Sequence, residues 1–164
     1  TSYSLDLSFD TDNEDAMALS NKLKELDEII IKTVADNSKE WLGKAYDINV
    51  IREALYKPLV RQGKEEYPDT MKLKIMTKPS GDFLAEAYNS AREMISVDQI
   101  EKGQRCACIV DVNQIWFIDN KFGVSVRLSQ VLCQQSAKLP SFAFQGLDGD
   151  EIVEEEYTEE EIDE

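Results

Sequence analysis

The segment Gly103–Cys133 constrains the fold of this chain more than any other part of the sequence. Two runs of β-branched, aromatic and aliphatic residues flank the polar tripeptide Asp119-Asn120-Lys121, which predicts two long strands joined by a tight turn. After the turn, Val124, Val126 and Leu128 alternate with Ser125, Arg127 and Ser129, the period of a strand with one wet face. Gly123 is expected to supply a positive φ or a bulge beside the turn.

The rest of the chain contains two further strand patterns and a long helical pattern. Apolar residues alternate with polar ones over residues 2–9 and over Met71–Thr77, and each segment is predicted to be a strand. A helix is expected after the capping residues Thr11-Asp12-Asn13, continuing through Trp41 and Leu42 and ending near Gly43. A shorter helix is expected over about Asp47–Tyr56. Residues 83–98 are compatible with either a strand or a short helix.

This order of elements predicts a mostly β (α+β) fold. A strand, a long helical insertion at about residues 13–60, a strand and a coiled hairpin are expected of an OB-like, partly open five-stranded barrel. A generic α+β sheet with helices on one face is the alternative. Residues 1–147 are expected to form one domain, followed by a disordered, acidic C-terminal tail over residues 148–164.

The net charge of −15 is distributed unevenly along the chain. Residues 148–164 contain eleven acidic side chains and no Lys or Arg, which leaves 22 acidic against 18 basic groups in the other 147 residues. The body is therefore close to neutral at about −4, and the acidic balance of the whole chain does not argue against a nucleic-acid partner.

The composition excludes several kinds of catalytic and metal site. The chain has no His, which excludes His-based acid–base catalysis and Ser-His or Cys-His nucleophiles. Cys106, Cys108 and Cys133 form neither a zinc pattern nor a disulfide framework, and they favour an intracellular, reducing compartment. Asp111, Asp119 and the tail carboxylates could hold Mg²⁺, but no acidic pair on adjacent strands stands out as a nuclease site. We therefore expect no cofactor, no metal and no enzymatic activity.

No membrane segment is expected either. The sequence has no apolar run long enough to cross a bilayer and no basic-then-apolar leader.

Basic and aromatic side chains gather on the predicted strands and the hairpin. Single-stranded nucleic acids are held by cations that follow the phosphates and by rings that stack on bases. The candidate nucleic-acid-binding residues are Lys72, Lys74, Lys78, Trp116, Phe117, Lys121, Phe122 and Arg127, with Tyr3, Arg61, Lys64, Lys102 and Arg105 flanking them. Each of these lysines, taken alone, is also typical of a solvent-exposed strand face or a protected sheet edge that binds no ligand. Clean alternation from Val110 turns Trp116 inward and Phe117 outward, and a bulge before the turn reverses this.

The acidic tail has two interpretations. It is either a solubilising segment or an intramolecular polyanion that competes with DNA for the basic surface and recruits partners. Apolar residues within it, such as Ile152 and Val153, favour the second interpretation. The candidate partner-binding and autoinhibitory residues are Glu154, Glu155, Glu156, Tyr157, Glu159, Glu160 and Glu161.

The segments Trp116-Phe117-Ile118 and Lys121–Val131, followed by Phe142-Ala143-Phe144 and an acidic end, resemble the single-stranded DNA-binding proteins of large eukaryotic DNA viruses. That family is in turn similar to the OB-fold single-stranded DNA-binding proteins of short-tailed phages. The resemblance covers about residues 103–145 best. It implies coating of replication and recombination intermediates, with an acidic tail that contacts replication proteins. The phage tails end in an aromatic residue, whereas this chain ends in Ile162-Asp163-Glu164.

The sequence thus predicts a non-enzymatic protein that binds single-stranded DNA without sequence specificity. A homodimer is compatible with it, and a viral protein of this kind would act in the cytoplasm or nucleus of an infected cell. The alternative is a protein-interaction module or DNA mimic that acts through its acidic surface.

Overall fold

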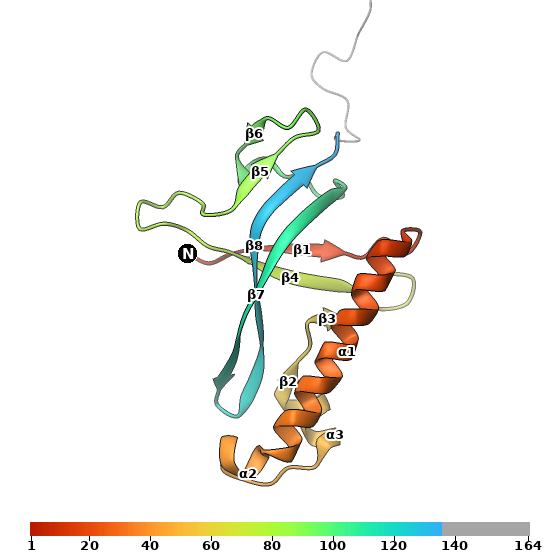
Figure 1. Ribbon diagram of the computed structural model, residues 1–164, viewed down its shortest axis with the longest axis vertical. Helices are drawn as coiled ribbons and strands as arrows, with labels where there is room; N and C mark the ends of the chain where they lie inside the picture. Colours follow the sequence, from red (N-terminus) through yellow and green to blue (C-terminus); the bar gives the residue numbers. More distant parts are fainter. Residues whose placement is uncertain (136–164) are drawn as a thin grey trace, which may run out of the picture.

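A single curled sheet built around one long strand dominates the structure, a computed structural model that describes residues 1–135 (Figure 1). The central strand β8 (Lys121–Cys133) pairs antiparallel with β7 (Cys106–Ile118) along one edge. Along its other edge β8 pairs in turn, always in parallel, with β2 (Tyr56–Lys57), β4 (Thr70–Ile75) and β5 (Glu86–Tyr88). These successive partners curl the sheet into an open half-barrel.

The remaining strands extend the two ends of this sheet. The strand β1 (Tyr3–Ser8) pairs antiparallel with β4, as does β3 (Val60–Arg61), and β6 (Met94–Ile95) pairs antiparallel with β5. In Figure 1 the β7–β8 hairpin crosses β1 and β4 and projects beyond them. The mostly β, OB-like open barrel with a helical insertion is confirmed. The sheet has eight strands among residues 1–135, of which β1, β4, β5, β7 and β8 have three or more residues.

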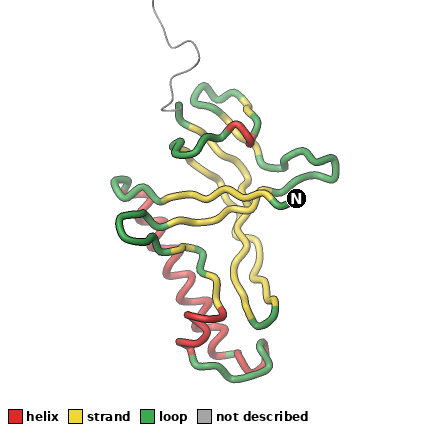
Figure 2. Tube along the Cα trace, turned by 180° about the vertical axis from the view of Figure 1, so that it is seen from behind, coloured by secondary structure: helices red, strands yellow, loops and turns green. Residues whose placement is uncertain are grey.

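The helices lie together beside the projecting end of the hairpin (Figure 2). The Asn13 side chain caps α1 (Glu14–Asp36) by accepting a hydrogen bond from the amide of Ala16 at 3.0 Å, as the capping pattern predicts. The predicted continuation through Trp41 is broken at Asn37, after which α2 (Ser38–Trp41) begins. The shorter helix is divided into α3 (Ile48–Val50) and a π-helical turn (Ile51–Leu55).

Residues 83–98 form strands, and the helical alternative for this segment is wrong. The segment contains β5 and β6, followed by a 3₁₀ turn (Val97–Gln99). Ser96 and Gln99 form a capping box at the start of this turn. Ala87 is fully buried, because β5 pairs with the end of β8 and closes the barrel there.

Two bulges interrupt the pairing of the long hairpin. The register passes from Ile109↔Gln130 to Val110↔Leu128, which leaves Ser129 as an extra residue on β8. It then passes from Val112↔Val126 to Gln114↔Ser125, which leaves Asn113 as an extra residue on β7. Because each extra residue reverses which side chains share a face, clean alternation along β7 ends at Asn113.

The hairpin turn needs two residues of positive φ, and the sequence supplies them. Asp119 and Asn120 have φ values of 50° and 64°, as in the two-residue turns that match the twist of paired strands. Lys121 is already the first residue of β8. The expectation for Gly123 is wrong, because it has neither a positive φ nor a bulge. A Cβ at Gly123 would lie 2.8 Å from Cζ2 of Trp116, so close ring packing requires the glycine.

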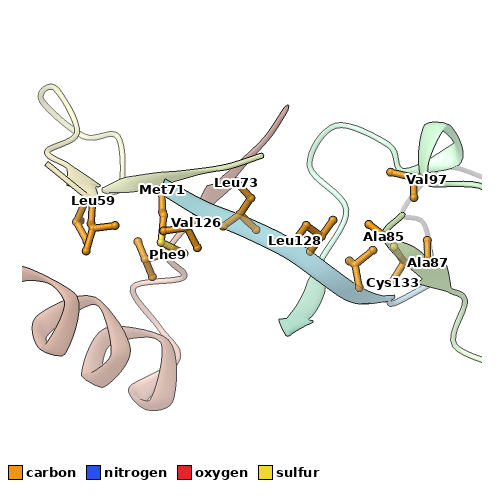
Figure 3. Close-up of a cluster of buried hydrophobic side chains, with 12 residues drawn as sticks. Phe9, Leu59, Met71, Leu73, Ala85, Ala87, Val97, Val126, Leu128 and Cys133 are labelled. Atoms are coloured by element: carbon orange, nitrogen blue, oxygen red, sulfur yellow. The ribbon is translucent and has the colours of Figure 1, made fainter. Parts of the chain in front are cut away.

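Buried side chains form two hydrophobic clusters, one inside the barrel and one beneath the helices. Figure 3 shows the barrel cluster, in which residues of β8 meet those of β4, β5 and the segment before β3. The second cluster packs α1 and the π-helical turn on the projecting end of the hairpin. Its buried members are Ile30, Ile31, Val34, Leu42, Ile51, Tyr56 and Phe122.

A buried carboxylate fixes α1 to the start of the sheet. Asp27 accepts hydrogen bonds from the Tyr56 hydroxyl, from the Leu59 amide at 2.8 Å and from the Val60 amide at 3.3 Å. Burial raises the pKa of the Asp27 carboxyl above its ordinary value, against the lowering effect of these three donors. The helix is thereby fastened to the segment that connects β2 and β3.

Among residues 1–135, no helix has the length and apolar character that a membrane-spanning segment requires.

Candidate nucleic-acid interface

A groove of about 960 Å³ lies between the projecting end of the hairpin and the strands that cross it. We call it the basic groove. Its walls come from β1, the β2–β3 segment, β4 and both strands of the hairpin. The basic side chains that line it are Lys57, Arg61, Lys72, Lys74 and Lys121. Asp119 is the one acidic residue among those that line this groove.

The groove cations are free of acidic partners in the described part of the chain. The four ion pairs within residues 1–135 use other basic residues, namely Lys22, Lys24, Arg52 and Arg105. Five cations and the single carboxylate of Asp119 line this concave surface, so its net charge is positive. An anion with regularly spaced charges, such as a phosphodiester backbone, complements such a surface.

Lys74 spans the floor of the basic groove. It lies opposite Arg127 in the parallel pairing of β4 with β8, and its Nζ donates a hydrogen bond to Oγ of Ser125 at 3.2 Å. Ser125 is buried, although alternation along β8 places it on a wet face. This face of β8 is polar, as predicted, and the buried Ser125 hydroxyl is hydrogen-bonded there to the side chain of Lys74.

Two aromatic residues line the basic groove, Tyr3 from β1 and Trp116 from the hairpin. The bulge at Asn113 places Gln114, Trp116 and Ile118 on the groove side, paired opposite Ser125, Gly123 and Lys121. Of the two orientations that the sequence left open, the bulged one is therefore correct. The ring is half-buried and lies against Gly123, and Nζ of Lys57 is 5.7 Å from its centroid. A flat apolar surface thus lies among the cations.

Phe117 and Phe122 lie on the opposite side of the hairpin. Phe122 is fully buried: its ring stacks on that of Phe117 with centroids 5.5 Å apart, and it packs at a tilt against Tyr56 with centroids 5.0 Å apart. The prediction of Phe122 as a binding residue fails, because its ring has no exposed surface on which a base could stack. Phe117 is 44% exposed, but it faces Trp41, with which it and Ile115 line a separate apolar hollow.

The other predicted basic residues lie outside the basic groove. Lys78 begins the tight turn before Asp82, whose carbonyl accepts a hydrogen bond from the Lys78 amide at 2.7 Å. Arg127 shares a face with Lys74 and is paired opposite Asp111 of β7, beyond the residues that line the groove. Arg105 forms an ion pair with Asp10 at 3.1 Å.

Lys57 extends the groove beyond the residues named from sequence, and Arg61 and Tyr3, which were expected to flank the site, also line it. Lys57 follows the helical insertion directly and contacts the Trp116 ring, and Arg61 lies on β3. Lys57 escaped prediction because a single lysine before Pro58 carries no sequence signal, and only the β2–β8 pairing brings it to the hairpin. Tyr3 at the groove rim packs edge-on against Phe83, with ring centroids 5.3 Å apart.

Within residues 1–135, no three or more His, Cys, Asp or Glu side chains are grouped so that they could hold a metal ion. The predicted autoinhibitory and partner-binding residues of the acidic tail lie outside the described residues.

Comparisons with known proteins identify a family and a structural likeness. Residues 5–145 match the model of a family of unknown function, DUF5871. No curated protein matches the chain. Among solved structures, the chain is similar to the single-stranded DNA-binding protein of bacteriophage Enc34, both as a C-terminal truncation and in complex with single-stranded DNA. Each is 13% identical with a TM-score of 0.49, and the alignment covers 84% of this chain and 75% or 73% of the phage chain. At this identity and TM-score the likeness carries no conclusion about function.

Proposed function

Because the chain belongs to a family of unknown function, DUF5871, we propose its function from its own geometry: it is a non-enzymatic protein that binds single-stranded DNA without sequence specificity. One observation carries this proposal. Five basic side chains, none of which forms an ion pair within residues 1–135, line a single groove together with the ring of Trp116. Cations that follow the phosphates and a ring that stacks on a base are the two components by which proteins hold single strands.

The position of the ring favours a single strand over a duplex. A base can stack on Trp116 only after it leaves its neighbours, because the bases of a duplex are already stacked on one another. Every base has a π-face, so stacking on one indole selects no sequence.

Lys57 connects the two components of the site. Its Nζ lies 5.7 Å from the centroid of the Trp116 ring, a distance typical of a cation–π contact. When a base covers the exposed part of the ring, the phosphate next to that base comes within reach of Lys57. Stacking and charge neutralisation then act on the same nucleotide.

We expect tighter binding to a single-stranded oligonucleotide than to a duplex of equal length. Fluorescence polarisation with labelled oligonucleotides should show this at moderate salt. The affinity should fall steeply as salt rises, since each neutralised phosphate releases condensed counterions, with a slope of roughly 0.7 per phosphate for a single strand. Equal or tighter binding to the duplex would contradict the proposal.

The acidic segment 148–164 is proposed to compete with DNA for the basic groove and to recruit replication proteins. Its eleven carboxylates are tethered to a body of about −4 that concentrates five cations in one groove. A group tethered to its binding surface has an effective concentration on the order of millimolar, so even a weak contact would be occupied. DNA that displaces the segment would release it for a partner. Replication and recombination intermediates are the proposed DNA substrates.

Deletion of residues 148–164 should therefore raise the affinity for single-stranded DNA, most of all at low salt. Removal of long-range repulsion would also raise affinity, so a second measurement separates the two causes. In NMR spectra of the DNA-free protein, deletion should shift the amide signals of Lys72, Lys74 and Lys121. If these signals do not move while the affinity rises, the segment repels DNA without occupying the groove.

A further inference from the structure

The three cysteines gather at the open end of the hairpin, far along β7 and β8 from Trp116. Cys106 is the first residue of β7 and Cys133 the last residue of β8, and the two are direct partners across the strands. Sγ of Cys108 lies 3.9 Å from Sγ of Cys106. All three are free thiols. Their side chains share the face of β7 and β8 that packs against the barrel cluster.

The pairing of Cys106 with Cys133 is of a kind whose typical Cα separation suits a disulfide. The Gln134 amide donates to the Arg105 carbonyl at 2.8 Å, which makes the adjacent pair Cys106–Cys133 a non-hydrogen-bonded one. Cα atoms in such pairs are about 4.5 Å apart, inside the disulfide range of roughly 4.4–6.8 Å. Cys106 and Cys108 are next-but-one neighbours on one strand, which separates their Cα atoms by about 6.7 Å, near the upper limit.

The surroundings make Cys106 the thiol that reacts first. A hydrogen bond from the Cys108 thiol lowers the pKa of Cys106 to about 7, against the opposing effect of burial. Burial raises the pKa of Cys133, which is 1% exposed. Cys106 is half-buried and so accessible to a small oxidant. The thiolate is the nucleophilic form of cysteine, and Cys106 carries more of it near neutral pH than its two neighbours.

We propose that Cys106 is a peroxide-reactive thiol and that Cys133 resolves it into a disulfide across the base of the hairpin. The Cys106 thiolate attacks one oxygen of hydrogen peroxide, so that an S–O bond forms, the O–O bond breaks and hydroxide leaves as water after taking a proton. The sulfur of Cys133 then loses its proton and attacks the Cys106 sulfur, which forms the S–S bond and expels the second water. Two thiols are oxidised and one peroxide is reduced.

The disulfide joins the ends of both hairpin strands without reaching the DNA groove. It closes a loop around the 26 residues between the two cysteines, which restricts the unfolded chain. The oxidised protein should therefore melt at a higher temperature than the reduced one. The groove residues lie at the other end of the hairpin, so the test below does not depend on the proposed binding of DNA.

Peptide mapping of the full chain after treatment with hydrogen peroxide tests the proposal. Trypsin leaves Cys106 and Cys108 together in peptide 106–121 and Cys133 in peptide 128–138. We expect these two peptides to be linked, with a loss of two hydrogens, and reduction with dithiothreitol to separate them. In Cys133→Ala, the unresolved sulfenic acid on Cys106 should instead be captured by dimedone.

Cys108→Ser is the matched control, because it removes a neighbouring thiol of the same strand face. This variant should still link the two peptides, because it keeps both sulfurs of the proposed bond. Cys106→Ser should form no link. A closed ring within peptide 106–121, a link between two protein molecules, or no reaction of Cys106 at peroxide concentrations that oxidise free glutathione would each overturn the proposal.

Discussion

Replacement of Trp116 by alanine should weaken the binding of single-stranded DNA roughly 5- to 150-fold, because stacking contributes about 1–3 kcal/mol per base. Trp116 is the ring that the bulge at Asn113 places in the basic groove. The dependence of affinity on salt should remain nearly unchanged, since the ring neutralises no phosphate. Titrations of a labelled oligonucleotide at several salt concentrations measure both quantities.

Phe117→Ala is the matched control for this variant. Phe117 is the next residue of the same strand and is 44% exposed, but it faces the apolar hollow with Trp41. Its removal should leave the affinity within about twofold, whereas Lys121→Ala should both weaken binding and lower the salt slope by roughly 0.7. If Phe117→Ala weakens binding more than Trp116→Ala, the DNA lies on the opposite side of the hairpin.

Replacement of Asp27 by alanine should lower the free energy of unfolding by about 3 kcal/mol or more. The change leaves the Tyr56 hydroxyl and the amides of Leu59 and Val60 without their acceptor, and each such group costs about 1–3 kcal/mol when it is buried. Glu28→Ala is the neighbouring control. It removes an exposed ion pair with Arg52 and should cost less than about 1 kcal/mol. Urea denaturation measures both variants.

The pH dependence of stability should carry the signature of a buried acid. The pKa of Asp27 is raised in the folded protein above the ordinary value of 3.8 that it has after unfolding. As pH rises from 3.8 through the folded pKa, the unfolded chain ionises first and the folded state loses stability relative to it. The stability advantage of the natural protein over Asp27→Asn should therefore be largest at low pH and shrink as pH rises. An advantage that grows with pH would show that the three donors outweigh burial.

Local chemistry made much of the fold predictable from sequence. A few neighbouring residues are enough to determine a strand with alternating side chains, a helix cap or a two-residue turn. The predictions of β1, β4 and β8, of the cap at Asn13 and of the Asp119-Asn120 turn rest on such local patterns. The same reasoning identified Lys72, Lys74, Trp116 and Lys121 as members of one site, and the structure brings all four into the basic groove.

The parts that sequence could not supply depend on pairings between distant strands. Neither Asn113 nor Ser129 carries a local signal for a bulge, yet the bulge at Asn113 decides which side Trp116 faces. From its position next to the hairpin turn, Phe122 is predicted to be an accessible ring. In the structure it is buried, because residues of α1 and Tyr56 pack against it. The position of Gly123 beside the turn predicts a backbone conformation that favours glycine. The structure gives a different reason, because the Trp116 ring leaves no room for a Cβ atom at this position.

The two tryptophans of the chain allow a direct test of where single-stranded DNA lies. Trp116 lines the basic groove, and Trp41 lies in the apolar hollow on the other side of the hairpin. Each can therefore be observed alone, in the variants Trp41→Phe and Trp116→Phe.

The deciding measurement is the change in tryptophan fluorescence when an oligothymidylate is added to each variant. We expect strong quenching in Trp41→Phe, because a base stacks on the remaining Trp116, and no change in Trp116→Phe, whose remaining Trp41 faces away from the groove. Quenching of Trp41 together with an unchanged Trp116 signal, at oligonucleotide concentrations that saturate binding by polarisation, would contradict binding in the basic groove.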